Sequence, residues 1–182
     1  MKGDAMLGNI KRRILELGNA RRCAVIILGF AIVATLVFIF SNSMKPPAES
    51  VADSNAVKDV IATIIPPESN LGKKILDNIR KIAHFTEYGL LGIEASCLTA
   101  LLAHKRRARY LAAGKSLIFA LVAAFLDETI QIFSSRGPMI ADMWIDVGGF
   151  FTYSVLTNLA LEAFLLGRYC VNKDLASKRD RN

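Results

Sequence analysis

The segment 124–149 carries the residues whose types and spacing could do chemistry. Its four carboxylates stand in an otherwise apolar stretch: Asp127, Glu128, Asp142 and Asp146. Charged side chains are costly in hydrocarbon, so acids within apolar segments normally face the interior of a bundle or a wet cavity and mark a functional site. A second polar group occurs earlier in the chain: His84, Glu87 and Tyr88.

Carboxylates beside one imidazole are suited to several kinds of chemistry. His84, with Glu87, Glu128, Asp142 and Asp146, could supply one nitrogen and several oxygens to a divalent metal ion, the first candidates being His84, Glu128 and Asp142. Metal-bound water could then serve a hydrolase acting on a lipid-linked substrate. Clustered acids could instead relay protons or ions in a transporter or flippase. They could also bind the polar part of an amphiphile, or only hold the helices together through a network of hydrogen bonds.

Four long apolar segments position these groups. The chain has 182 residues, of which 53% are apolar, and the apolar residues are gathered in runs. This pattern is typical of an integral membrane protein rather than a large soluble core. We predict helices over 23–40, 82–103, 110–133 and 139–166. At about 1.5 Å per residue, helices of this size cross most or all of a ~30 Å hydrocarbon core.

Residues 41–81 are too polar to span a membrane. Two proline pairs interrupt this segment, at 46–47 and at 66–67. Between the pairs, the apolar spacing over 51–65 predicts a short amphipathic helix lying on the membrane surface. The stretch 71–85 repeats this pattern, and we expect it to lead directly into the helix over 82–103.

Positive charge is clustered beside the apolar segments. The net charge is +7, but the clusters lie where a membrane surface would be and no nucleic-acid motif accompanies them, so no nucleic-acid partner is expected. Residues 1–22, the loop after 103 and the tail 167–182 are basic, whereas the loop before 139 holds only Arg136. The positive-inside rule therefore places both termini in the cytoplasm.

These observations predict an all-α integral membrane protein built as a four-helix transmembrane bundle, with a long amphipathic outer segment between its first two helices. Its parts are a basic cytoplasmic N-terminus over 1–22, the transmembrane domain over 23–166 and a basic cytoplasmic tail over 167–182. We expect it in the bacterial cytoplasmic (inner) membrane as a multi-pass protein.

The predicted orientation brings the polar groups to one depth. Three separate helices place them within about 10 Å of the outer surface, so we expect one acidic pocket between the last three helices. Its members would be His84, Glu87, Tyr88, Asp127, Glu128, Gln131, Arg136, Asp142 and Asp146. Gly148 and Gly149 would let another helix approach closely. Lys81 is expected to approach the pocket, and Ser41 and Ser43 to border its rim.

Several of these residues also form a recognisable string. FSNS at 40–43, KIAHFTEYGLLG at 81–92 and DETIQIFSSRGPMIADMWIDVGG at 127–149 resemble, in order and spacing, the VanZ-like family of bacterial membrane proteins. Asp146 departs from the family pattern, which usually has asparagine there. The resemblance implies a cell-envelope protein. The name-giving members are associated with low-level resistance to teicoplanin, a lipid-tailed glycopeptide that acts on cell-wall precursors at the outer membrane face.

Residues and resemblance together favour one function. We expect the protein to bind or divert amphiphilic or lipid-linked molecules, such as a glycopeptide antibiotic or a wall precursor, at the outer leaflet through the acidic pocket. Membrane lipids are the expected general partners. A metal-dependent hydrolase and a proton-coupled transporter or flippase are the alternatives. No catalytic residue is assigned, and no resident cofactor is expected, although a divalent metal is left open.

Overall fold

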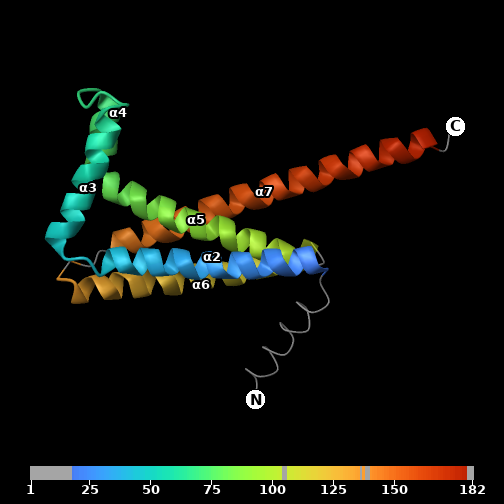
Figure 1. Ribbon diagram of the computed structural model, residues 1–182, viewed down its shortest axis with the longest axis horizontal. Helices are drawn as coiled ribbons and strands as arrows, with labels where there is room; N and C mark the ends of the chain where they lie inside the picture. Colours follow the sequence, from blue (N-terminus) through green and yellow to red (C-terminus); the bar gives the residue numbers. More distant parts are fainter. Residues whose placement is uncertain (1–17, 104–105, 136, 138–139, 180–182) are drawn as a thin grey trace, which may run out of the picture.

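The computed structural model describes residues 18–103, 106–135, 137 and 140–179, and this part of the chain is helical without any strand. The helices are α2 (Asn19–Ser43), α3 (Pro47–Ala62), α4 (Asn70–Asp77), α5 (Ile79–Leu102), α6 (Arg106–Phe133) and α7 (Ile140–Arg179). Helices α2, α5, α6 and the first part of α7 lie together as a bundle, and α3 and α4 stand at one end of it (Figure 1). The predicted all-α class is confirmed.

Three helices of the described part are long and apolar enough to cross a membrane. They are α2, the segment Ala112–Phe133 of α6 and the segment Ile140–Lys173 of α7. Helix α5, predicted as a fourth span, is not among them because its charged residues lower its mean hydropathy. It nevertheless packs against α2, α6 and α7. A helix enclosed in this way can carry polar side chains, since they face its neighbours instead of lipid.

The core forms where the other bundle helices meet α5. Its buried apolar residues are Ile39 of α2, Tyr88, Leu91 and Ala95 of α5, Ala120, Ala123 and Ala124 of α6, and Phe150 of α7. The small alanine side chains on α6 let its backbone approach the neighbouring helices closely. Large apolar side chains such as Phe30, Ile118 and Phe125 are exposed on the outer faces of α2 and α6. Outward-facing apolar surface of this kind is what lipid-facing helices present.

Helices α5 and α7 cross at glycine. A side chain at Gly149 of α7 would collide with the backbone carbonyl of Phe85 in α5. On the α5 side, a Cβ at Gly92 would lie 2.5 Å from the carbonyl oxygen of Phe150, and one at Gly89 would lie 2.6 Å from the ring of Tyr153. Of the two glycines predicted to allow a close approach, Gly149 makes one and Gly148 faces open space.

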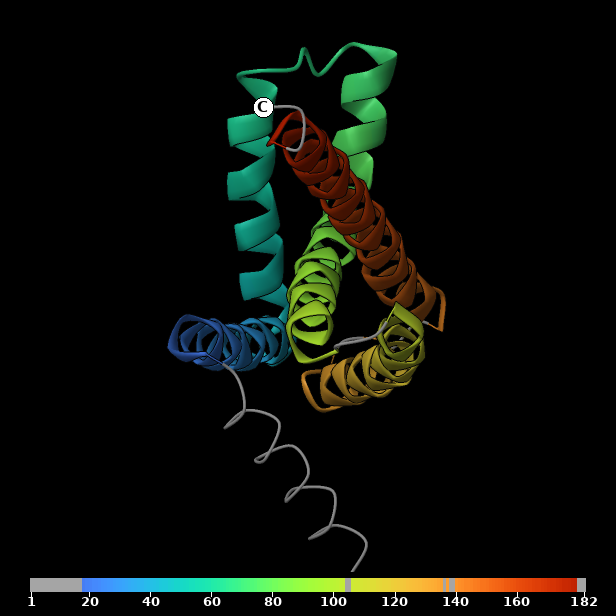
Figure 2. The ribbon, with the colours of Figure 1, turned by 90° about the vertical axis from the view of Figure 1, so that its right-hand side faces the viewer.

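Helices α3 and α4 form a hairpin that rises from the end of the bundle (Figure 2). Pro47 occupies the first turn of α3, where its missing N–H costs nothing. Ser69 caps α4 by accepting a 2.9 Å hydrogen bond from the Gly72 backbone N–H. Asn78 separates α4 from α5 with non-helical backbone angles (φ −112°, ψ 17°). The expected direct continuation of α4 into α5 is therefore interrupted at this residue.

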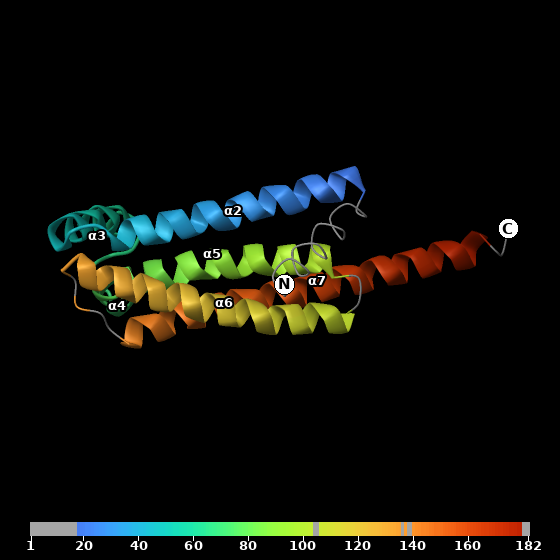
Figure 3. The same cartoon turned by 90° about the horizontal axis from the view of Figure 1, so that it is seen from below.

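Side chains tie α2 to the bundle at both of its ends. The Arg21 guanidinium donates to the Leu101 carbonyl at the end of α5. At the hairpin end, the Ser134 hydroxyl donates to the Ser43 carbonyl over 2.8 Å. Helix α7 continues well beyond the bundle (Figure 3). It was predicted to end at 166, but it runs to Arg179 because a helix needs no apolar residues once it has left the core.

Candidate functional site

The buried centre of the polar residues comprises one side chain from each of three helices. His84 comes from α5, Asp127 from α6 and Asp146 from α7. The Nδ1 atom of His84 lies 3.2 Å from Oδ1 of Asp146 and 3.8 Å from Oδ2 of Asp127. One potential ligand atom from each residue lies within 4.8 Å of the other two. We call these three residues the His–Asp–Asp cluster.

The cluster is enclosed by protein. Asp127 and Asp146 have no exposed surface, and His84 retains only 9%. Both carboxylate oxygens of Asp146 are buried without a regular hydrogen bond from a described residue, and Nδ1 of His84 approaches one of them to 3.2 Å. A carboxylate that is fully buried without donors is rare, since burying a charge is costly unless it is paired or bound to a metal.

Gln131 connects the acids of α6 to a cation of α5. Its amide nitrogen donates to Asp127 over 3.3 Å and to Glu128 over 3.1 Å. Its amide oxygen accepts a 2.9 Å hydrogen bond from the guanidinium of Arg80. Lys81 was expected to approach the pocket. Its side chain is exposed, and it lines a small cavity that His84 and Asp142 also border.

Two hydroxyl groups complete the enclosure. Tyr88 is fully buried, and its hydroxyl has no hydrogen-bond partner among the described residues. Ser43, at the end of α2, is buried next to Asp127. Ser41, which was expected beside it at the rim, is exposed instead. The site therefore includes a residue of α2 as well as residues of the last three helices.

The remaining predicted members lie around this centre. Glu87 faces α2, where Asn42 donates to it over 3.4 Å. Asp142 is partly buried beside a cavity of about 190 Å³ that His84 also borders. Arg136, predicted to hang over the pocket as a counter-charge, lies outside the described residues.

A larger cavity of about 700 Å³ lies on the other side of α5, between α2, α3 and α5. Part of its wall is apolar: Phe38, Val57, Ile61, Ile79 and Ile82. Polar groups also line it: Asn42, Lys45, Asp53, His84 and Glu87. The acidic pocket was expected between the last three helices, but Asp127 and Asp146 are buried there and line neither cavity. The open space next to the cluster is thus bounded by α2 and the hairpin.

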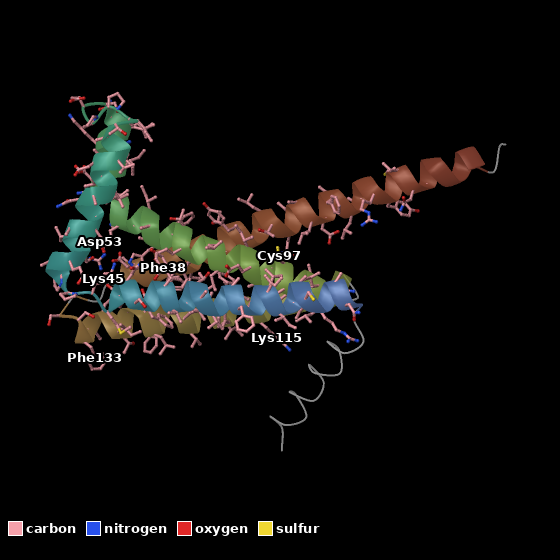
Figure 4. The ribbon with its side chains drawn as sticks, in the orientation of Figure 1. Phe38, Lys45, Asp53, Cys97, Lys115 and Phe133 are labelled. Atoms are coloured by element: carbon pink, nitrogen blue, oxygen red, sulfur yellow. The ribbon has the colours of Figure 1, made fainter. Side chains whose placement is uncertain are left out.

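A salt bridge spans the corner between α2 and α3. The ammonium of Lys45 lies 2.6 Å from a carboxylate oxygen of Asp53, and Figure 4 shows the two side chains near Phe38 at this corner. The hydrogen bond to Asp53 raises the pKa of Lys45 above its usual value. Lys45 therefore stays charged at neutral pH and helps to fix α3 over the cavity.

A second polar contact lies deeper in the bundle. Glu94 is buried one heptad after Glu87, and its carboxylate accepts a 3.0 Å hydrogen bond from the Thr35 hydroxyl of α2. It lies outside the His–Asp–Asp cluster and both cavities described above.

The fold and the site define a helical membrane protein with an enclosed His–Asp–Asp cluster next to an amphipathic cavity. A family model described as VanZ/LLP1 matches residues 27–161, and the chain belongs to this family. The match includes α3, α4, α5 and the whole His–Asp–Asp cluster. No curated protein and no solved structure matches the sequence.

Sequence reasoning missed two contributors to the site, Arg80 and Asn42. Both are adjacent to residues that had been singled out, Lys81 and Ser43. A helical-wheel comparison would have placed Arg80 one turn before His84, on the same face. The contact of Asn42 with Glu87 depends on how α2 packs on α5, which periodicity within one segment does not reveal.

Proposed function

We propose that the protein is a multi-pass protein of the bacterial inner membrane that binds or diverts amphiphilic or lipid-linked molecules at the outer leaflet. The observation that carries this proposal is the 700 Å³ cavity between α2, α3 and α5. Its apolar wall suits a hydrocarbon tail, and its polar residues suit a head group. Cavities of roughly 300–1,000 Å³ are typical of small-molecule sites in proteins.

The proposed topology has four crossings with both termini in the cytoplasm. Basic residues over 1–22 and 167–182 favour this orientation under the positive-inside rule. The hairpin and the cavity are at the bundle end opposite Arg21, which contacts the C-terminal part of α5. This arrangement supports a cavity at the outer face. In the proposed topology, α5 crosses as an enclosed helix although it is not among the three candidate spans.

The position of the cavity supports an amphiphilic ligand over a purely polar one. It is bounded by the ends of α2 and α5 on one side and by α3 of the hairpin on the other. A molecule that enters there keeps its tail near lipid and its head near Glu87 and His84. A lipid-tailed glycopeptide and a lipid-linked wall precursor both have this shape, and family membership favours these two ligand classes.

A cavity-filling substitution tests the proposal. Val57 of α3 lines the cavity, whereas Val60 of the same helix does not. Both side chains are partly exposed, at 48% and 62%, so tryptophan fits at either position without entering the core. Val57→Trp should weaken the binding of fluorescently labelled teicoplanin or of a labelled polyprenyl diphosphate to the nanodisc-embedded protein by more than tenfold, and Val60→Trp should leave it unchanged.

Bacteria carrying each variant provide the second measurement. Expression of wild type and Val60→Trp should raise tolerance to teicoplanin equally, and Val57→Trp should not. If both variants bind and protect like wild type, the cavity does not hold the ligand. If the protein's activity in vesicles instead follows an imposed proton or ion gradient, the transporter alternative replaces binding.

A further inference from the structure

We propose that His84, Asp127 and Asp146 form a three-ligand site for one divalent transition-metal ion, and that this ion anchors the anionic head group of the amphiphile in the neighbouring cavity. The second half of the proposal rests on the proposed function; the first half stands on the geometry of the cluster alone.

The spacing of the cluster matches metal ligation. Atoms that surround a tetrahedral ion at about 2.0–2.2 Å stand about 3.4 Å from one another. The distances from His84 Nδ1 to the two aspartates are 3.2 Å and 3.8 Å, and all three ligand atoms lie within 4.8 Å of one another. Small rotamer adjustments would bring them into a coordination shell. One imidazole and two carboxylates suit ions such as Zn²⁺ and Mn²⁺.

The unmatched oxygens of Asp146 are the second, independent observation. Both are buried and accept no hydrogen bond from a described residue. His84 alone could satisfy one oxygen with a proton on Nδ1. The same proton could not also be donated to the other oxygen of Asp146 or to Asp127, whose Oδ2 lies 3.8 Å from Nδ1. A divalent cation neutralises two carboxylates at once, so it fits the cluster better than a single proton does.

The cluster has routes for an ion and room for a further ligand. His84 borders both the 700 Å³ cavity and the 190 Å³ cavity, which also includes Asp142. An ion could therefore reach the cluster past Asp142 and remain accessible from the larger cavity. Three protein ligands leave at least one coordination position for water or for an oxygen of a bound molecule, as in metal sites that bind substrates.

A bound ion would change what the cavity attracts. Without it, Glu87 and the two buried aspartates counteract the attraction that Lys45 and Arg80, which also line the cavity, exert on an anionic head group. With it, the local charge is reversed and a phosphate or diphosphate oxygen gains a positive partner. The proposal therefore selects lipid-linked phosphates as ligand class over cationic peptides.

Asp146 supplies a sharp variant for the test, because asparagine is nearly the same size and stands at this position in the pattern that the chain resembles. Asp146→Asn should fold, yet it removes one of the two negatively charged ligands. Glu94→Gln is the matched control, since Glu94 is also buried, and lies on α5 outside the cluster.

The experiment measures metal content and affinity on the full chain, purified in detergent with an affinity tag that contains no histidine. After saturation with Zn²⁺ or Mn²⁺ and removal of free ion, wild type and Glu94→Gln should each retain about one ion per chain. Asp146→Asn and His84→Gln should lower the affinity more than tenfold, since even residues outside the first coordination shell change it by roughly 10–100-fold. Substitution with Co²⁺ should give a visible spectrum that both cluster variants lose.

Two results overturn the metal site. One is a well-folded wild-type protein that binds none of Zn²⁺, Mn²⁺ and Co²⁺, and the other is an Asp146→Asn protein that binds them as wild type does.

The proposed role of the ion as head-group anchor is tested by comparing the binding of farnesyl diphosphate with that of farnesol. Metal removal should weaken binding of the diphosphate at least tenfold and leave farnesol unchanged. If diphosphate binding survives metal removal, the metal does not anchor the head group, but the proposed function still holds. If Val57→Trp is the variant that loses binding of both farnesyl diphosphate and farnesol, the cavity is supported as the binding site.

Discussion

Gly149 of α7 lies directly against the backbone carbonyl of Phe85 in α5. The contact stands next to the site in both helices, because Phe85 follows His84 and Gly149 is one turn after Asp146. The closest point of the helix crossing therefore fixes the 3.2 Å separation between His84 and Asp146. A side chain at position 149 would meet the Phe85 backbone, so we expect it to move these two residues apart.

Gly149→Ala should destabilise the bundle and disturb the His–Asp–Asp cluster. The added methyl meets backbone, which cannot rotate away, so overpacking should cost about 1–3 kcal/mol. The midpoint of thermal unfolding in detergent measures this loss. Gly148→Ala is the control, because a side chain there meets nothing within 4 Å. Equal midpoints for the two variants would show that the crossing is looser than described.

Gln131→Leu should destabilise the protein through the acids that it supports. The substitution removes the donor shared by Asp127 and Glu128 and leaves the inward hydrogen bond of Arg80 without an acceptor. Leaving buried polar groups unsatisfied costs about 1–3 kcal/mol. Unfolding midpoints and the abundance of the protein in membranes report the effect. Thr129→Val on the same helix removes only an exposed bond to its own backbone, and it should behave like wild type.

The salt bridge between Lys45 and Asp53 should control how firmly α3 covers the cavity. Lys45→Gln should speed hydrogen exchange of the α3 amides, and Lys73→Gln on α4, which is exposed, should not. The pKa of Lys45 is raised above 10.5 by Asp53, so the charge that the pair needs is fully present below that pH and is lost as the pH rises through the raised pKa. Exchange of α3, corrected for its intrinsic rate, should thus show no change from this pair between about pH 6 and 9. A marked change of the exchange rate within that pH range would mean that other groups hold α3 in place.

Cysteine labelling tests the proposed orientation. In a chain whose three native cysteines are replaced by serine, Glu68→Cys places a thiol in the exposed loop between α3 and α4, and Lys173→Cys places one near the end of α7. A membrane-impermeant maleimide should label position 68 in intact spheroplasts and position 173 only after permeabilisation. Labelling of both positions in intact cells would mean that the termini and the hairpin share a side.

The sequence was sufficient to predict the elements and much of the site. The long apolar runs marked the bundle helices, and the i, i+3, i+4 stripe of α5 placed His84 and Tyr88 at the centre. The depth argument predicted one group of polar residues from three helices, and in the structure His84, Asp127 and Asp146 of three helices lie together. These features are local, because helical periodicity and charge distribution fix them before any packing is known.

Other features depend on packing and escaped prediction. Glu87 lies on the same face of α5 as His84, yet its hydrogen-bond partner is Asn42 because α2 packs beside it. The cavity could not be foreseen because it depends on α3 folding back over α5, which the break at Asn78 and the prolines allow but do not specify. The sequence offered Glu87, Glu128, Asp142 and Asp146 as metal ligands beside His84. The structure brings Asp146 to His84 but adds Asp127 in place of the others, because the packing of the helices decides which acids meet the imidazole.

The two ties of α2, from Arg21 to Leu101 and from Ser134 to the Ser43 carbonyl, have a mechanical consequence. Because α2 is held to the bundle at both of its ends, we expect it to form a fixed wall of the cavity. Helix α3 is joined to that wall through the short link at 44–46 and to α5 through α4 and Asn78, which gives it a hinge on each side. If the cavity widens to admit a bulky molecule, we therefore expect the hairpin to move while the bundle stays in place.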